Sequence, residues 1–188
     1  MKTLRKTAEE AYLKYANKII NRETWIDGFI SGIQYKKEYP QSIELCGLLW
    51  DTENLAIGGY EKDGHHYYTW QEAMDAAKAV GKRLPSCQEW KALCDLGSTW
   101  DDELKGRWFG GNHNSDHKGS LFLPAAGLRY YNSGELAYTS SYGYYWSSSP
   151  NYGGNSYAGS LYFSSGSVYP LNGNNRAIGF SVRCVQNK

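Results

Sequence analysis

The sequence lacks charge over a long stretch near its C-terminus: no Asp, Glu, Lys, Arg or His occurs between Glu135 and Arg176. Residues 140–175 consist almost wholly of Tyr, Ser, Gly and Asn. These residue types also dominate antibody paratopes, because Tyr offers a large amphipathic contact area at low cost in rotamer entropy while Ser, Gly and Asn offer adaptable hydrogen bonds. The segment therefore predicts a binding surface.

A disordered, low-complexity tract has a similar composition. Here, however, apolar residues recur at strand-like intervals, and Ile178, Phe180, Val182 and Cys184 alternate with Gly, Ser and Arg, as in a half-buried strand. We therefore interpret the segment as loops held between core strands.

Other absences exclude whole classes of function. The net charge is only +1 and no basic stripe occurs, which argues against nucleic-acid binding. No apolar run is long enough to insert in a membrane, so a soluble protein is expected. The basic residues at the N-terminus have no apolar segment behind them. We therefore expect no signal peptide and synthesis in the cytoplasm.

Cysteine is scarce, with four residues in the chain. Cys87 and Cys94 lie seven residues apart in one expected helix, about 10 Å along its axis, which is too far for a disulfide. Without a secretory signal the compartment is expected to be reducing. Buried free thiols are therefore predicted.

The chain divides near residue 41. Residues Thr3 to Tyr39 have helical periodicity, and Pro40 ends the region. This helical N-terminal segment, residues 1–41, either packs on the main domain or serves for assembly, as a homo-oligomer or by attachment to a larger structure. The main domain is expected over residues 42–188.

The main domain is expected to open with two short strands, SIELCGLLW and NLAIGGY, around a turn at residues 51–53. Two helices follow. Thr69 and Glu72 have capping-box spacing before a helix that Gly81 stops, and Ser86 caps a second helix that ends near Gly97. Short strands then alternate with Gly-rich turns; the expected strands are GRWFGG, LFLPAAGLRYY, YYWSSS, YAGSLYF and AIGFSVRCV. This order predicts a mixed α+β class.

Five sequence phrases together resemble a known family: GLLW near the start of the domain, GKRLPSCQEWKAL, FLPAAGLR, YGYYWSSSP and RAIGFSVRCV. In this order and spacing they resemble the C-type lectin-like fold of the formylglycine-generating-enzyme branch, over roughly Ile43 to Gln186. The resemblance implies a C-type lectin-like domain with two helices and short antiparallel strands, preceded by the short helical N-terminal segment.

Within that branch the chain resembles the variable proteins of diversity-generating retroelements, major tropism determinants among them. Mutation of template adenines in such systems turns codons such as AAC into codons for Asn, Ser, Gly, Tyr or Ala, but not for Lys, Glu, Gln, Met or Trp. All five excluded types are absent between Ser147 and Asn175. The resemblance thus implies a variable-type region at about residues 147–178. Its candidate ligand-binding residues are Asn151, Tyr152, Gly153, Gly154, Asn155, Ser156, Tyr157, Gly159, Ser160, Tyr162, Ser164, Ser165, Ser167, Tyr169, Asn172, Asn174 and Asn175.

Catalytic and metal chemistry is not expected. Formylglycine-generating enzymes use a cysteine pair, whereas Cys184 is alone in its alternating strand and is better explained as a buried structural thiol. His113 and His117 have the spacing of a helical metal pair, but their Gly- and Asn-rich surroundings favour a solvated loop. Ca²⁺-dependent sugar binding needs carboxylates in the ligand loops, and the C-terminal run has none. We expect neither a catalytic residue nor a metal or other cofactor.

The sequence and the resemblance together predict a ligand-binding protein with a diversifiable surface. It would be a retroelement-diversified receptor-recognition protein of a phage or bacterium, such as a component of the phage tail, and its partner would be a protein or another cell-surface ligand. The alternatives are an invariant surface or phage structural domain of the same fold and, less favoured, a relative of the formylglycine-generating oxidoreductases.

Overall fold

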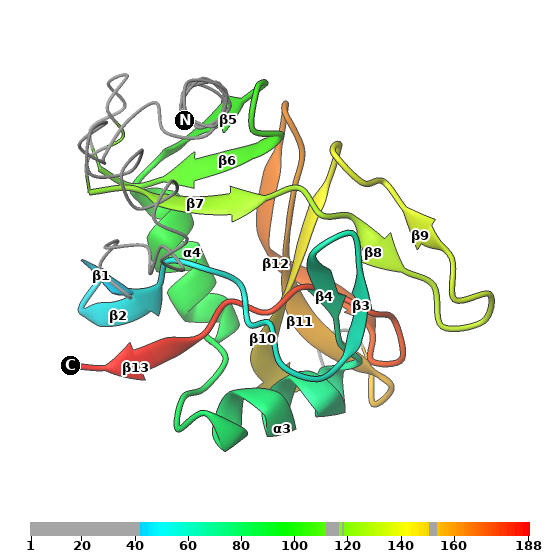
Figure 1. The fold of residues 1–188 in the computed structure, drawn as a ribbon. Coiled ribbons are helices and arrows are strands. Elements are labelled where there is room, and N and C mark those ends of the chain that lie inside the picture. Colours follow the sequence, from blue (N-terminus) through cyan, green and yellow to red (C-terminus); the bar gives the residue numbers. More distant parts are fainter. Residues whose placement is uncertain (1–41, 112–116, 118, 151–153) are drawn as a thin grey trace, which may run out of the picture.

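The computed structural model describes residues 42–111, 117, 119–150 and 154–188 (Figure 1). The helices predicted within residues 1–41 lie outside these described residues. The described strands are β1 (Ser42–Leu45), β2 (Leu48–Asp51), β3 (Tyr60–Lys62), β4 (His65–Tyr67), β5 (Ser98–Asp101), β6 (Gly106–Phe109), β7 (Leu121–Pro124), β8 (Leu128–Arg129), β9 (Leu136–Ala137), β10 (Gly143–Pro150), β11 (Tyr157–Phe163), β12 (Val168–Asn175) and β13 (Val185–Asn187).

Two helices precede most of the strands, α3 (Trp70–Ala79) and α4 (Cys87–Asp95). Each begins with a complete capping box, in which Thr69 and Ser86 accept from the backbone of Glu72 and Glu89 while those glutamates accept from the cap backbone. The predicted N-termini at Thr69 and Ser86 are therefore confirmed. Each capping box satisfies two N–H groups that the helix would otherwise leave unpaired. Neither described helix has the length and apolar character needed to cross a membrane.

The strands form five small antiparallel sheets, ordered β1-β2-β13, β10-β11-β12, β3-β4, β5-β6-β7 and β8-β9. Strand accounts for 45% of the described residues and helix for 14%. This composition contradicts the expected fold, a C-type lectin-like arrangement of helices and strands preceded by a helical segment. Only the coarse α+β class agrees, since two helices pack on antiparallel sheets.

Tight turns keep these sheets small. The stretch SIELCGLLW was expected to be one strand, but it is the β1–β2 hairpin, turned by Cys46 and Gly47 with φ of 52° and 75°. A two-residue hairpin turn of type I′ needs positive φ at both central positions, and glycine adopts it without strain. Asp63 and Gly64 turn β3 into β4 in the same way.

Two apolar cores lie on opposite sides of the sheet β10-β11-β12. The first, called the α4 core, joins that helix to the sheet. Its main buried residues are Trp50, Trp90, Leu93, Phe109, Tyr145, Leu161 and Phe163. The second, called the α3 core, covers part of the other face. Its main buried residues are Tyr68, Ala73, Ala77, Trp146, Ala158, Phe180 and Val182.

The C-terminal segment differs from the half-buried strand that its alternation predicted. Every residue from Gly179 to Val185 is buried, and bridges join Phe180 to Tyr68 and Ser181 to Tyr145. The segment passes through the interior, so neither set of alternating side chains reaches solvent. Arg183, almost fully buried, donates to the side chain of Asn54 at 2.7 and 3.0 Å.

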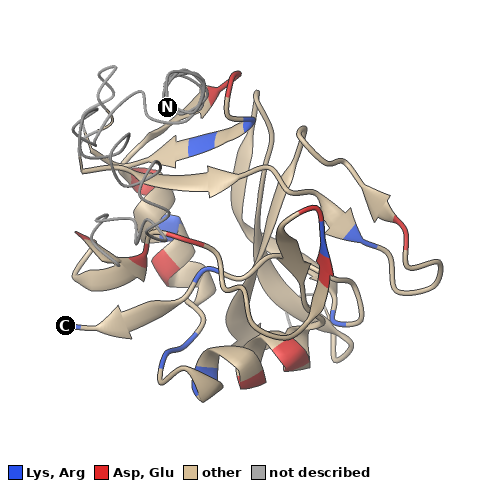
Figure 2. Cartoon of the chain, viewed as in Figure 1, with Lys and Arg blue, Asp and Glu red and all other residues tan. Residues whose placement is uncertain are grey.

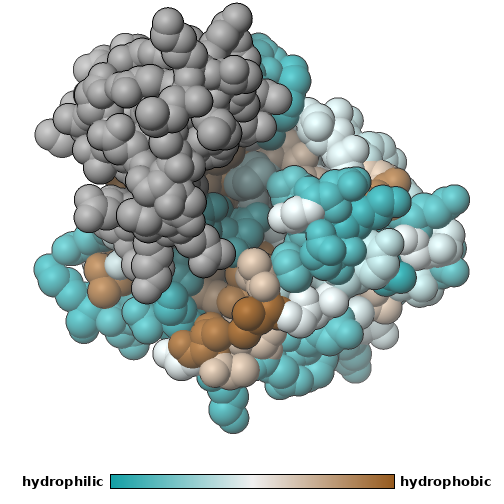
Figure 3. Space-filling model, in the orientation of Figure 1, coloured by the Kyte–Doolittle hydropathy of each residue, from teal (hydrophilic) through white to brown (hydrophobic). Residues whose placement is uncertain are grey.

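Charge is distributed unevenly over this fold. Figure 2 shows charged residues on α3, α4, β6, β8 and several turns, whereas β10, β11 and β12 carry none. In the hydropathy view of Figure 3, apolar residues gather low in the middle, while the right-hand edge, where β8 and β9 lie in Figure 1, is mostly hydrophilic.

Candidate binding surface

A row of three tyrosines crosses the sheet β10-β11-β12. Tyr144 is the register partner of Tyr162, and Tyr162 is the register partner of Tyr169. Their ring centroids are 5.2 Å and 5.6 Å apart. Directly opposed residues of an antiparallel pair project to the same face of the sheet. Each of the three strands therefore contributes one ring to the row. Tyr144 and Tyr162 are half-buried, and Tyr169 on the edge strand is 55% exposed.

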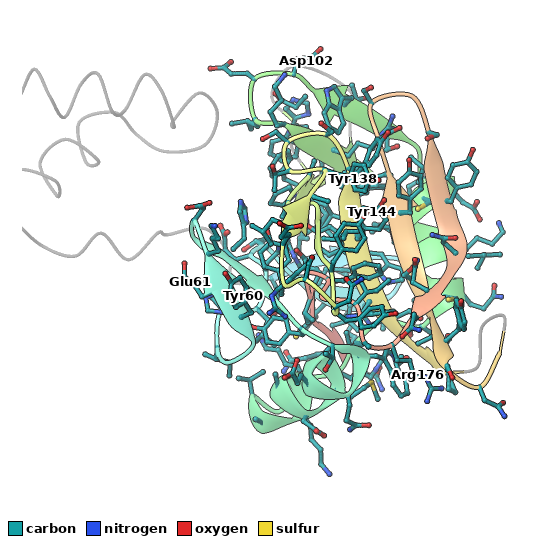
Figure 4. All side chains as sticks on the ribbon, turned by 90° about the vertical axis from the view of Figure 1, so that its right-hand side faces the viewer. Tyr60, Glu61, Asp102, Tyr138, Tyr144 and Arg176 are labelled. Atoms are coloured by element: carbon teal, nitrogen blue, oxygen red, sulfur yellow. The ribbon has the colours of Figure 1, made fainter. Side chains whose placement is uncertain are left out.

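Two further tyrosines extend this row. Tyr142 stands nearly perpendicular to Tyr144, at 83° with centroids 6.4 Å apart, and also meets Tyr162 at 5.5 Å. Tyr138 lies 5.0 Å from Tyr142 and is 47% exposed. Tilted and edge-to-face pairs of this kind favour a fixed arrangement of rings. We call Tyr138, Tyr142, Tyr144, Tyr162 and Tyr169 the tyrosine surface; Tyr138 and Tyr144 lie near the middle of the view in Figure 4.

The tyrosine surface is anchored from below and from the side. The ring of Tyr144 stacks on buried Phe180 at 5.0 Å, and Phe180 in turn packs on Trp146 at 4.3 Å. The loop that carries Tyr138 and Tyr142 is bonded to the neighbouring segment, with the backbone N–H of Gly127 donating to the carbonyl of Tyr142 at 2.8 Å. These contacts hold the rings in place before any partner arrives, which lowers the entropy lost on binding.

Electrostatically the tyrosine surface is neutral. Burial raises the pKa of Tyr144 well above its ordinary value, and the neighbouring Tyr162 raises it further. A hydrogen bond with Tyr138 raises the pKa of Tyr130, which lies beside the surface. The hydroxyls of Tyr144 and Tyr130 therefore keep their protons at neutral pH.

The predicted site residues divide between several places. Tyr162 and Tyr169 belong to the tyrosine surface. Ser164, Ser165 and Ser167 lie in the adjoining β11–β12 turn, where the hydroxyls of Ser164 and Ser167 are 2.9 Å apart. The guanidinium of Arg107 donates to the carbonyls of Ser164 and Ser165 at 2.9 and 2.8 Å, so the turn is held through its backbone.

A second group lies at the far end of β11. Gly154, Asn155, Ser156 and Tyr157 are exposed there, and Tyr157 is paired with Asn175 of β12. Five residues of strand separate Tyr157 from Tyr162, about 16 Å, and the two side chains project to opposite faces. The predicted residues thus do not form a single patch.

The middle of β11 is closed. Ser160 is fully buried and its hydroxyl accepts from Asn174 at 2.9 Å. Gly159 is also buried, and a Cβ there would lie 2.8 Å from Ser147 Oγ and against Cys87 Sγ. Gly159 and Ser160 therefore leave the predicted binding set.

Other predicted positions are less informative. Asn172 and Asn174 are half-buried, on the same face as the tyrosine surface. Asn151, Tyr152 and Gly153 lie outside the described residues.

Three of the five surface tyrosines are absent from the predicted set. Tyr138, Tyr142 and Tyr144 precede Ser147, where the codon argument begins. Their signal in the sequence is the charge-free run itself, which starts directly after Glu135 and already contains them.

A separate cavity of about 300 Å³ lies among the β3–β4 hairpin, the β5–β6 turn and the loop after β9. Asp63, His65, Lys105 and Ser140 line it, and three of these, all but His65, have positive φ. Burial lowers the pKa of His65, opposed by Asp63. The imidazole is therefore neutral at pH 7. The described residues contain no group of three or more His, Cys, Asp or Glu side chains that could hold a metal ion.

The described cysteines are all free. Burial raises the pKa of Cys94 and of Cys184 to about 12. Nucleophilic and metal-binding cysteines act as thiolates and have lowered pKa values. These two thiols therefore have the character of packing residues, whereas Cys46 is exposed.

Comparison with known proteins gives a partial match to one family model. The family model of a domain of unknown function, DUF8237, matches residues 95–185. No curated protein and no solved structure matches the chain. The matched segment runs from the end of α4 to the start of β13 and contains the whole tyrosine surface.

Proposed function

We propose that this protein binds a macromolecular ligand, a protein or another cell-surface molecule, through the tyrosine surface and the adjoining β11–β12 turn. The observation that carries the proposal is the continuous row of partly exposed rings from Tyr138 to Tyr169, in a segment that contains no charged residue. Tyrosine is favoured at binding hot spots because it buries much area with few rotatable bonds.

The size of the surface supports this function. A standard interface buries about 800 Å² on each partner, and one aromatic side chain contributes roughly 150–250 Å². Three or four of these tyrosines would supply most of such an interface, with the serines of the turn at its polar rim. Binding is non-covalent in this proposal and uses no metal.

We further propose that the surface is diversified by a retroelement and serves receptor recognition for a phage or bacterium. Tyr162, Tyr169 and the turn serines lie in the variable-type region and are accessible, whereas Tyr138, Tyr142 and Tyr144 precede it. The ligand would then meet a constant set of rings beside a changeable one. Residues 1–41 are the proposed point of attachment to a larger assembly such as a phage tail.

DNA sequence tests diversification. The neighbouring DNA should encode a reverse transcriptase and carry an adenine-rich near-copy of the 3′ end of the gene. Among natural copies, substitutions should concentrate at exposed positions such as Ser165 and Tyr169 and spare Gly159 and Ser160. An isolated gene with the same residues in every copy would instead indicate an invariant surface domain.

Affinity measurement tests binding. Once a ligand has been isolated from the surface of the recognised cell, Tyr162→Ala and Tyr169→Ala should each weaken its binding more than tenfold without unfolding the protein. Tyr131→Ala is the matched control, because Tyr131 is exposed but lies outside the tyrosine surface. Unchanged affinity in both test variants would place the binding site elsewhere.

A further inference from the structure

Two arginines, one on each side of the charge-free segment in the sequence, lie over aromatic rings. The guanidinium carbon of Arg129 is 4.3 Å from the centroid of Tyr60, and that of Arg176 is 4.3 Å from the centroid of Trp70. At this distance the cation is attracted by the negative face of the ring. The protein thus uses guanidinium stacking on both sides of the segment that supplies the tyrosine surface.

Among the described residues, no cation lies over a ring of the tyrosine surface. Neither Arg129 nor Arg176 lies over one of its rings, and the segment between Glu135 and Arg176 contains no charged residue. With no positive side chain in this segment, the exposed ring faces keep their negative potential. An aromatic surface of this kind complements a cation.

The geometry suits a flat cation that enters from solvent. Tyr142 stands at 83° to Tyr144 and at 67° to Tyr162, so the cluster presents ring planes in two directions. Tyr138 and Tyr169, at the two ends, are about half exposed. A guanidinium is planar and weakly hydrated, and it can lie on one ring while its N–H groups donate to the phenolic oxygens around it.

We propose that the tyrosine surface binds an arginine side chain presented by a protein partner. The inference rests on the proposed function, to which it adds the chemistry of the partner's central contact. Arginine is favoured over lysine, because its planar group stacks on aromatic faces and sheds water at lower cost. It is also among the residue types enriched in interfaces.

The test compares two peptides that differ only in charge, acetyl-Gly-Arg-Gly-amide and its citrulline counterpart. Citrulline keeps the planar urea shape but is neutral. Titration of the full chain in 150 mM NaCl, followed by NMR of the tyrosine ring resonances, gives both affinities. We expect the arginine peptide to bind about tenfold more tightly than the citrulline peptide. Equal affinity for the two peptides overturns the inference.

Variants locate the contact. Tyr169→Ala and Tyr142→Ala should remove the preference for arginine, whereas Tyr169→Phe should keep it, because phenylalanine retains the ring face. Tyr131→Ala, outside the surface, should also keep it. Tyr169 is exposed, so its substitution tests the inference even if Tyr142→Ala fails to fold. A preference that survives Tyr169→Ala and Tyr142→Ala in folded protein places the cation elsewhere and refutes the inference.

The outcome is separable from that of the proposed function. If the natural ligand loses affinity in Tyr162→Ala and Tyr169→Ala but the arginine peptide is not preferred, the binding function stands and the partner chemistry proposed here is wrong. If the natural ligand is unaffected by the tyrosine variants, both proposals fail.

Discussion

The two faces of the sheet β10-β11-β12 place the same residue type, tyrosine, in different environments: one face buries it in a core and the other leaves it partly exposed. Tyr144 and Tyr145 are neighbours in β10, yet they point to different sides. Tyr145 is fully buried in the α4 core, where its hydroxyl donates to the carbonyl of Pro124 at 2.9 Å and accepts from Asn54 at 3.2 Å. Tyr144 lies in the open row beside Tyr142 and Tyr162, with its ring stacked on Phe180.

The comparison teaches that tyrosine content alone does not identify a binding residue. What distinguishes the two side chains is the layer above them. The α4 core, which includes Phe109 of β6, lies against one face of the sheet, while the α3 core covers the end of the other face that carries Trp146 and Ala158. The uncovered end is the tyrosine surface. Substitutions on the two faces should therefore have different consequences.

The largest difference is expected between Phe163→Ala and Tyr169→Ala. Phe163 is fully buried against Phe109 and Tyr145, so its truncation should cost about 3–5 kcal/mol of unfolding free energy. Tyr169→Ala should cost less than about 1 kcal/mol, since its ring is more than half exposed. Urea denaturation measures both. Similar losses would mean that the two faces are equally buried.

A smaller difference should separate two glycines of the variable-type region. Gly159→Ala forces a methyl group against Cys87 and Ser147 and should cost about 1–3 kcal/mol through overpacking. Gly166→Ala meets nothing within 4 Å and should change stability by less than about 0.5 kcal/mol. Melting temperatures report both effects. If Gly159→Ala melts at the wild-type temperature, Cys87 and Ser147 do not pack tightly against the middle of β11.

The next effect concerns a buried hydroxyl. Ser160→Ala removes the acceptor of the Asn174 side-chain amide inside the sheet and should cost about 1 kcal/mol. Ser165→Ala, at an exposed position of the β11–β12 turn, is the control and should be nearly neutral. Chemical denaturation of the two variants gives the comparison; equal values would return Ser160 to the accessible set.

Removal of divalent metal ions is expected to have no effect. The tyrosine surface contains no carboxylate, so EDTA should change neither the melting temperature nor the affinity for the ligand. Differential scanning fluorimetry with and without 1 mM Ca²⁺ after chelation is sufficient for stability, and the same buffers serve for affinity. Loss of binding in EDTA that Ca²⁺ restores would contradict a metal-free surface.

Local signals in the sequence predicted local structure well. Thr69 with Glu72 marked the start of α3, and the stretch YAGSLYF, predicted to be a short strand, coincides with β11. Strand β12 was missed, because Pro170, Gly173 and three asparagines disfavour a strand. An edge strand tolerates them, since one side of its backbone needs no partner in the sheet.

The layers around each strand could not be predicted in the same way. In the alternation of β11, Gly159 and Ser160 resemble accessible small residues, but α4 covers one of them and the strand β12 with Asn174 covers the other. Burial of small polar side chains depends on which elements pack across them, and no local pattern records that. The expected lectin-like arrangement was wrong for the same reason: it concerned how the elements assemble.

Arg107 has a consequence for how this protein can change. It holds the β11–β12 turn by donating to two main-chain carbonyls, and every amino acid brings the same carbonyl. The backbone path of the turn therefore does not depend on which side chains stand at positions 164 and 165. Because Arg107 lies on another strand, the side chains of the turn can be substituted while its backbone conformation is kept. The shape of the turn and the chemistry that it displays can then change independently.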